Sequence, residues 1–177
     1  MLHHLNYKLP VFKLMMVKEE KKQKNPLPSI RSALDAAKLL EPLCFAPEEH
    51  FVALHLNSKF EVIGLHEVSH GTLSASLVHP REVFKAALVA NSYAILVCHN
   101  HPSGAKLSAS REDLTTTRTL IDAGKLLGVS VLDHLIVGPQ QQSDIVRKKK
   151  RESRILPLSI REEHPELWQS DVDCLSA

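Results

Sequence analysis

A short apolar run in the middle of the chain ends in two histidines, and this feature restricts the fold most. Residues 94–98 read Ala-Ile-Leu-Val-Cys, which is typical of a buried strand. Side chains two residues apart on a strand lie on the same side. We therefore expect His99 and His101 to project together, with Asn100 turned away, before Pro102 ends the strand. The fold must place polar side chains at the end of a buried strand.

A helix is expected to begin at Ser110, because serine is a favourable N-cap residue. Asp113 lies one helical turn later, on the same side. Two imidazoles and one carboxylate, with a position left open for water, suit a catalytic zinc ion. The alternative is that Ser110 and Asp113 form only a capping arrangement, and that the His-x-His pair belongs to an ordinary loop. The residue pattern alone leaves both interpretations open.

The pattern His99-x-His101-Pro102, followed by Ser110-x-x-Asp113, resembles the JAMM motif of MPN-type zinc metallopeptidases. The wider sequence resembles the JAB domain of bacterial RadC-like proteins over residues 28–138. The likeness also rests on four further segments: Gly71-Thr72-Leu73, Val78-His79-Pro80-Arg81-Glu82-Val83, Asp122-Ala123-Gly124-Lys125-Leu126-Leu127-Gly128 and Leu132-Asp133-His134.

Two features depart from the family pattern. The loop from His101 to Ser110 is one residue longer than usual, and Ala109 stands where the family commonly has proline. A loop absorbs one residue at little entropic cost. The position of Asp113 relative to the two histidines nevertheless depends on how this loop folds.

The resemblance implies a single α/β domain of the JAMM/MPN, cytidine-deaminase-like type, with a central mixed β-sheet flanked by helices. It implies Zn²⁺ held by His99, His101 and Asp113, and hydrolysis of a peptide or isopeptide bond by metal-activated water. Glu49 is the expected general base, with Glu48 as its rival. The implied substrate is a peptide or protein whose identity does not follow.

Ser110 is a candidate catalytic residue in addition to a helix cap. In this interpretation its hydroxyl donates to the oxyanion that develops during amide hydrolysis. One hydroxyl has both a donor and acceptors, so the two roles do not exclude each other.

The remaining periodicity predicts alternating helices and strands. Predicted helices span 32–43, 80–91 and 110–127, and predicted strands span 51–57, 61–69 and 129–138. The expected buried positions of the helix over 110–127 are Leu114, Ile121 and Leu127. Asp133 and His134 interrupt the last strand, either because they support the site through hydrogen bonds or because they lie at a sheet edge.

Three segments are expected: an N-terminal extension over 1–28, the JAB/MPN-like domain over 29–138, and a basic, partly disordered C-terminal tail over 139–177. An edge strand is possible at Val11–Met15, and a short helix is expected over 162–169. No closing strand is evident after residue 138.

Composition excludes several classes of protein. The hydrophobic content of 44% is sufficient for one domain with a buried apolar core. The formal net charge of +2 indicates neither a nucleic acid nor an acidic protein as a partner. The three cysteines form no CxxC pair, so no disulfide framework or cysteine zinc site is indicated. No apolar run is long enough to cross a bilayer and no secretory signal is evident, so a cytoplasmic protein without membrane contact is expected. The sequence does not indicate an oligomeric state.

A second functional class is a non-catalytic or nuclease-like module associated with DNA repair or mobile elements. A basic run, comprising Arg147, Lys148, Lys149, Lys150 and Arg151, is a candidate for weak DNA binding through phosphate contacts. The RadC branch carries a DNA-repair label, but residues 1–28 are too short for its usual helix-hairpin-helix-like region. One zinc ion with a single carboxylate also offers little for a two-metal phosphate clamp.

Overall fold

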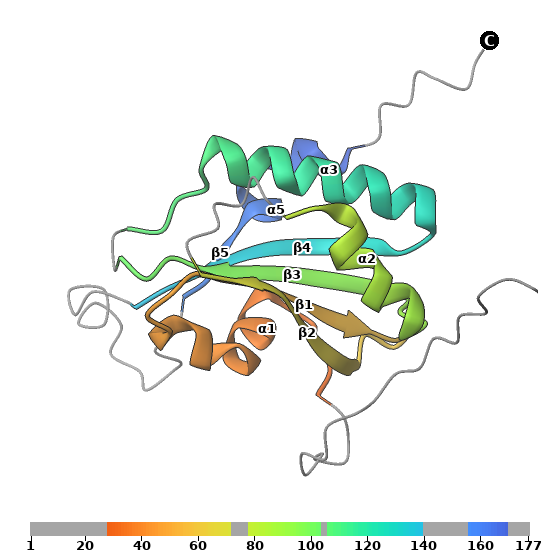
Figure 1. Cartoon of the computed structure of the whole chain (residues 1–177), viewed down its shortest axis with the longest axis horizontal. Coiled ribbons are helices and arrows are strands. Elements are labelled where there is room, and N and C mark those ends of the chain that lie inside the picture. Colours follow the sequence, from red (N-terminus) through yellow and green to blue (C-terminus); the bar gives the residue numbers. More distant parts are fainter. Residues whose placement is uncertain (1–27, 72–77, 104–105, 140–155, 170–177) are drawn as a thin grey trace, which may run out of the picture.

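The computed structural model describes residues 28–71, 78–103, 106–139 and 156–169, and it confirms the predicted α/β fold (Figure 1). Within these residues, five strands form one mixed sheet in the order β2-β1-β3-β4-β5. The strands are β1 (His50–Leu56), β2 (Val62–His70), β3 (Ala94–Asn100), β4 (Ser130–Val137) and β5 (Leu158–Ser159). β3 is central: it pairs with β1 in antiparallel and with β4 in parallel orientation.

Helices cover both faces of the sheet. They are α1 (Ala33–Leu39), η1 (Glu41–Phe45), α2 (Pro80–Val89), α3 (Arg111–Leu127), α5 (Ile160–Glu163) and η3 (Pro165–Trp168). α2 and α3 lie on one side of the sheet and α1 on the other (Figure 1). No helix in the described ranges combines the length and apolar character needed to cross a membrane.

An apolar core lies on each face, because successive strand residues alternate sides. Phe51, Val97 and Val131 pack with apolar residues of α2 and α3. Val52 and Leu96 pack on the opposite face with apolar residues of α1 and η1. The strand predicted over 94–98 is therefore buried on both sides, and it continues to Asn100, where the sheet meets the candidate site.

Most predicted elements are present, with two informative differences. The helix predicted over 32–43 ends at Leu39, and a separate 3₁₀ helix follows. Pro42 explains the break, since it lacks the N–H that an α-helix would need at that point. Leu127 and Leu114 were expected in the core, but Leu127 is 41% exposed and Leu114 is half-buried, whereas Thr117 and Gly124 of the same helix are buried.

β4 carries one extra residue opposite β3. Ile95 pairs with Val131 and Val97 pairs with His134, so β4 advances three residues where β3 advances two. Such a bulge shifts the alternation of side chains, and it turns His134 toward α3. The Asp133 carboxylate accepts a hydrogen bond from the His134 N–H at 2.7 Å. The two polar residues that interrupt the predicted strand therefore mark a bulge, and both are buried.

Part of the segment predicted as a tail folds onto the sheet. β5 pairs with β4 through Leu158 and Ser159, and Ile160 of α5 is fully buried. A two-residue strand is too short for its alternation to be recognised in the sequence, so this closing strand after residue 138 becomes evident only in the structure. The basic run Arg147–Arg151 and the strand considered at Val11–Met15 lie outside the described residues.

His55 makes the stability of the fold depend on pH. This β1 residue is 3% exposed, its Nδ1 lies 3.0 Å from the Ser92 hydroxyl, and burial lowers its pKa from 6.5 to about 4. Between those values the unfolded chain binds a proton that the folded protein does not, so acidification favours unfolding. We expect His55 to account for a loss of roughly 2–3 kcal/mol in the free energy of unfolding between pH 7 and 4.5.

Denaturant unfolding of wild type and His55→Gln at both pH values measures this contribution. The variant should lose less stability on acidification, because glutamine does not titrate while the other buried histidines are unchanged. If the two proteins lose the same stability on acidification, groups other than His55 cause the loss.

Candidate metal centre

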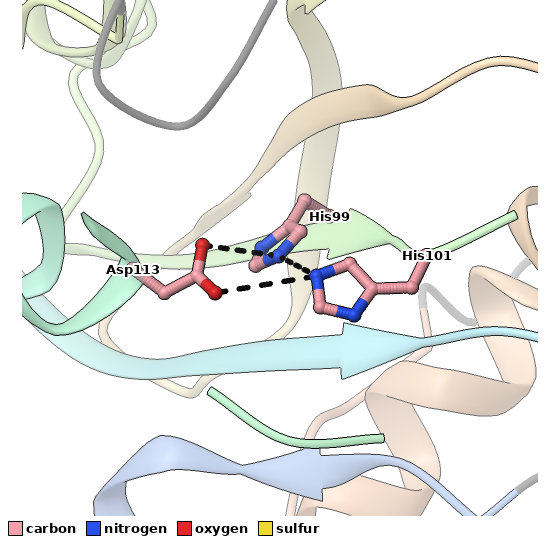
Figure 2. Close-up of side chains that lie close together, drawn as sticks. All are labelled: His99, His101 and Asp113. Carbon is pink, nitrogen blue, oxygen red and sulfur yellow. Dashed lines mark hydrogen bonds and ion pairs between the residues drawn. The ribbon is translucent and has the colours of Figure 1, made fainter. Parts of the chain in front are cut away.

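Two elements bring the predicted ligands together at the end of β3. His99 is the penultimate residue of β3, His101 follows the strand directly, and Asp113 lies in the first turn of α3. Figure 2 shows the three side chains pointing toward one another. The longer loop before Ser110 therefore does not separate the carboxylate from the histidines.

The distances suit a single metal ion. His99 Nε2 lies 3.0 Å from His101 Nε2 and 3.3 Å from Asp113 Oδ1, and one ligand atom from each residue falls within 4.8 Å of the others. Metal–ligand bonds of about 2.0–2.2 Å in a tetrahedron place ligand atoms about 3.3 Å apart. Within the described part of the chain, this is the group of histidine and acidic residues that meets the spacing for a metal ion.

The Ser110 capping box orients the carboxylate. Ser110 donates to Asp113 Oδ2 from both its backbone N–H and its hydroxyl, each at 2.8 Å, and its hydroxyl oxygen accepts from the Asp113 N–H at 3.0 Å. Oδ1 faces His99, and Oδ2, which accepts both Ser110 bonds, also lies 4.0 Å from His101 Nε2. The capping and metal-binding interpretations of these two residues are compatible, since the cap directs one carboxylate oxygen to the site.

His99 is poised to bind as a neutral imidazole. It is 6% exposed, and burial lowers its pKa below the usual value of 6.5 despite the opposing effect of the Asp113 carboxylate. The ring therefore carries one proton at neutral pH and offers one nitrogen lone pair, which is the form that coordinates a metal.

His134 lies directly behind His99, and its role does not follow from the sequence alone. Its Nε2 is 2.8 Å from His99 Nδ1, and the residue is fully buried. Asp133 faces the other way: its carboxylate accepts hydrogen bonds from the Ser159 hydroxyl at 2.7 Å and the Arg161 N–H at 3.2 Å. His134 thus supports a candidate ligand, while Asp133 anchors the bulge and the C-terminal segment.

Glu49 lines the same cavity as the three candidate ligands. The cavity has a volume of about 270 Å³, and its walls also include Ser110 and Phe51. Glu49 is exposed and directly precedes β1, as the sequence analysis expected. Glu48 lines an adjoining depression that also contains Glu49 and His101. Both carboxylates are therefore near the site, but of the two Glu49 alone lines the cavity of the histidines.

Asn100 holds the backbone on both sides of Glu49. Its side chain turns away from the two histidines, as predicted, and is fully buried. Its Oδ1 accepts from the His50 N–H at 2.7 Å, and its Nδ2 donates to the Glu48 carbonyl at 2.9 Å. One residue between the two histidines therefore ties the candidate base to the candidate metal ligands, a link that the sequence pattern does not reveal.

The fold and the site together define an α/β domain with a candidate metal centre at the end of its central strand. A model of the RadC-like JAB domain family matches residues 30–150, and the chain belongs to this family. The family is the one that the motifs His99-x-His101 and Ser110-x-x-Asp113 predict.

Curated relatives carry the name UPF0758 protein. The chain is 52% identical over 101 residues to one from Staphylococcus haemolyticus, covering 57% of this chain and 44% of the relative. It is 47% identical over 113 residues to one from Geobacillus sp. (63% and 50%) and over 115 residues to one from Methanococcoides burtonii (64% and 50%). The chain spans about half the length of these relatives.

Proposed function

We propose that this protein is a zinc-dependent amide hydrolase that acts on peptide or isopeptide bonds. The observation that carries the proposal is the convergence of His99, His101 and Asp113 beside Glu49 in one cavity. The donor set of two imidazoles and one carboxylate, with room for water, is the set found in catalytic zinc sites. The motif resemblance to JAMM metallopeptidases supports the same reaction class.

A zinc ion at this site would lower the pKa of a bound water to about 7. Glu49 would accept a proton from the attacking water and then deliver it to the leaving amine. Ser110 would turn its hydroxyl proton toward the developing oxyanion. Asp113 Oδ2 would keep the Ser110 backbone N–H as a donor during this rotation. The Asn100 contacts would keep Glu49 at the cavity throughout.

Metal removal and restoration test this proposal. Purified protein should contain about one zinc ion per chain, as catalytic zinc sites do, and should cleave members of a mixed peptide and isopeptide library, read by mass spectrometry. A chelator should abolish the cleavage, and one equivalent of zinc should restore it. Cleavage that continues without metal would contradict the proposal, as would retention of iron in place of zinc.

A nucleic-acid arm of the same experiment tests the alternative class. Metal-dependent degradation of DNA, with peptides left intact, would replace the amide hydrolase with a nuclease. DNA binding through the basic run 147–151 stays a prediction, and its affinity would fall steeply with salt. Deletion of residues 147–154 should remove that affinity without changing the zinc content.

A further inference from the structure

A continuous chain of hydrogen bonds runs from α3 to the ring of His99. The Thr117 hydroxyl lies 2.6 Å from the Asp113 backbone carbonyl oxygen and 2.6 Å from His134 Nδ1. His134 Nε2 lies 2.8 Å from His99 Nδ1. These four residues are 6% exposed or less, so water does not compete for the bonds.

The direction of this chain follows from its first bond. A carbonyl oxygen only accepts, and two oxygens 2.6 Å apart need the proton between them, so the Thr117 hydroxyl donates to Asp113. The hydroxyl has no second proton, and it must therefore accept from His134 Nδ1–H. His134 is fully buried, which keeps its ring neutral and leaves Nε2 without a proton. That nitrogen accepts from His99 Nδ1–H.

We propose that Thr117 and His134 are positioning residues that hold His99 in the tautomer with its bare Nε2 directed at the metal centre. A neutral imidazole with its proton on Nδ1 has its lone pair on Nε2. That atom is the one that lies 3.3 Å from Asp113 Oδ1 and 3.0 Å from His101 Nε2. The inference rests on the proposed metal site, but it concerns a proton arrangement that exists without metal.

The surrounding structure keeps the two rings in place. Phe51 stacks on His99 with ring centroids 6.1 Å apart and meets His134 edge-on at 5.3 Å. The bulge in β4 directs His134 to this face, and Asp133 holds the bulge through the His134 N–H. Asp113 contacts both ends of the hydrogen-bond chain. Its carboxylate is a candidate metal ligand beside His99, and its backbone carbonyl accepts a hydrogen bond from the Thr117 hydroxyl.

Thr117→Val tests the proposal, because valine keeps the branched shape and removes the hydroxyl. His134 Nδ1–H then has no acceptor, so the proton moves to Nε2 and His99 must carry its own proton on the metal-facing nitrogen. We expect zinc affinity, measured by competition with a chromophoric chelator, to fall about 10–100-fold. Thr117→Ser, which restores the hydroxyl, should bind zinc like wild type.

Thr119→Val is the matched control. Thr119 makes the same bond to the carbonyl four residues earlier, at 2.9 Å to Thr115, but contacts neither histidine. This variant should bind zinc like wild type. Equal zinc affinity in the valine variants of Thr117 and Thr119 would overturn the proposal.

Nitrogen-15 NMR of the histidine rings gives a reading that needs neither metal nor activity. In the metal-free wild-type protein, His99 and His134 should each carry their proton on Nδ1. A proton on Nε2 of His99 would mean that the chain runs in the opposite direction, and the proposal would fail. If wild type binds no zinc yet shows the expected tautomers, the metal proposal fails and this inference stands. If Thr117→Val does not fold, the wild-type spectrum alone still tests the proposal, because it shows which ring nitrogens of His99 and His134 carry the protons.

Discussion

Replacing both His99 and His101 with alanine is expected to remove metal binding almost completely. Four-ligand zinc sites bind with apparent free energies of about 10–16 kcal/mol, so each ligand contributes about 3 kcal/mol. Each lost histidine should therefore weaken binding by about 10²–10³-fold, and two should leave no metal after dialysis. Metal content by inductively coupled plasma mass spectrometry and affinity by chelator competition measure the effect.

His164→Ala is a suitable control for this experiment. His164 pairs with Glu166 at 3.0 Å on the C-terminal segment and does not line the candidate cavity. The control should keep its metal. Equal metal content in the double variant and the control would mean that the ion binds elsewhere. That result would contradict the proposed metal site and the hydrolysis that depends on it. The removal of one buried imidazole also changes packing, so circular dichroism should verify the fold of each variant.

Glu49→Gln is expected to keep the metal and lose most of the hydrolysis. Glutamine has nearly the same shape, but its amide cannot take a proton from water at neutral pH. General acid–base catalysis contributes about 10²–10⁴-fold to a rate, and kcat should fall by that amount. Metal analysis and single-turnover rates on the same preparation separate the two effects. Loss of metal together with activity would make Glu49 a ligand or a structural residue.

Glu48→Gln is the matched control, since it makes the same chemical change one residue earlier. Glu48 is exposed and lines the adjoining depression, while its backbone carbonyl is held by Asn100. The Glu48 variant should keep most of its activity. The reverse result, with an active Glu49 variant and an inactive Glu48 variant, would move the base to Glu48.

The strands and the ends of α3 could be predicted because their signals are local in the sequence. The apolar run 94–98 and the hairpin strands follow from side-chain alternation, and the cap at Ser110 and the stop at Gly128 follow from preferences of single residues. Gly128 has a φ of 69°, in the left-handed region that glycine tolerates. These elements were predicted within one or two residues of the observed bounds.

Other features depend on contacts between distant residues and could not be predicted in this way. Hydrophobic periodicity places Leu127 in the core, but the buried face of α3 includes Thr117, because that hydroxyl meets His134 of β4. β5 is two residues long, and only its pairing with β4 and the burial of Ile160 make it part of the domain. No pattern within either segment carries that information.

The sequence by itself determined the residue types at the site, the strand that presents the two histidines, and the family to which the chain belongs. The tertiary structure alone decided that Asp113 reaches those histidines across a longer loop, that Asn100 secures the backbone around Glu49, and that His134 supports His99 through a bulge. The physical reason is that a strand's alternation is set by neighbouring residues. The meeting of polar groups 14, 35 or 50 positions apart is instead set by how the sheet and α3 pack.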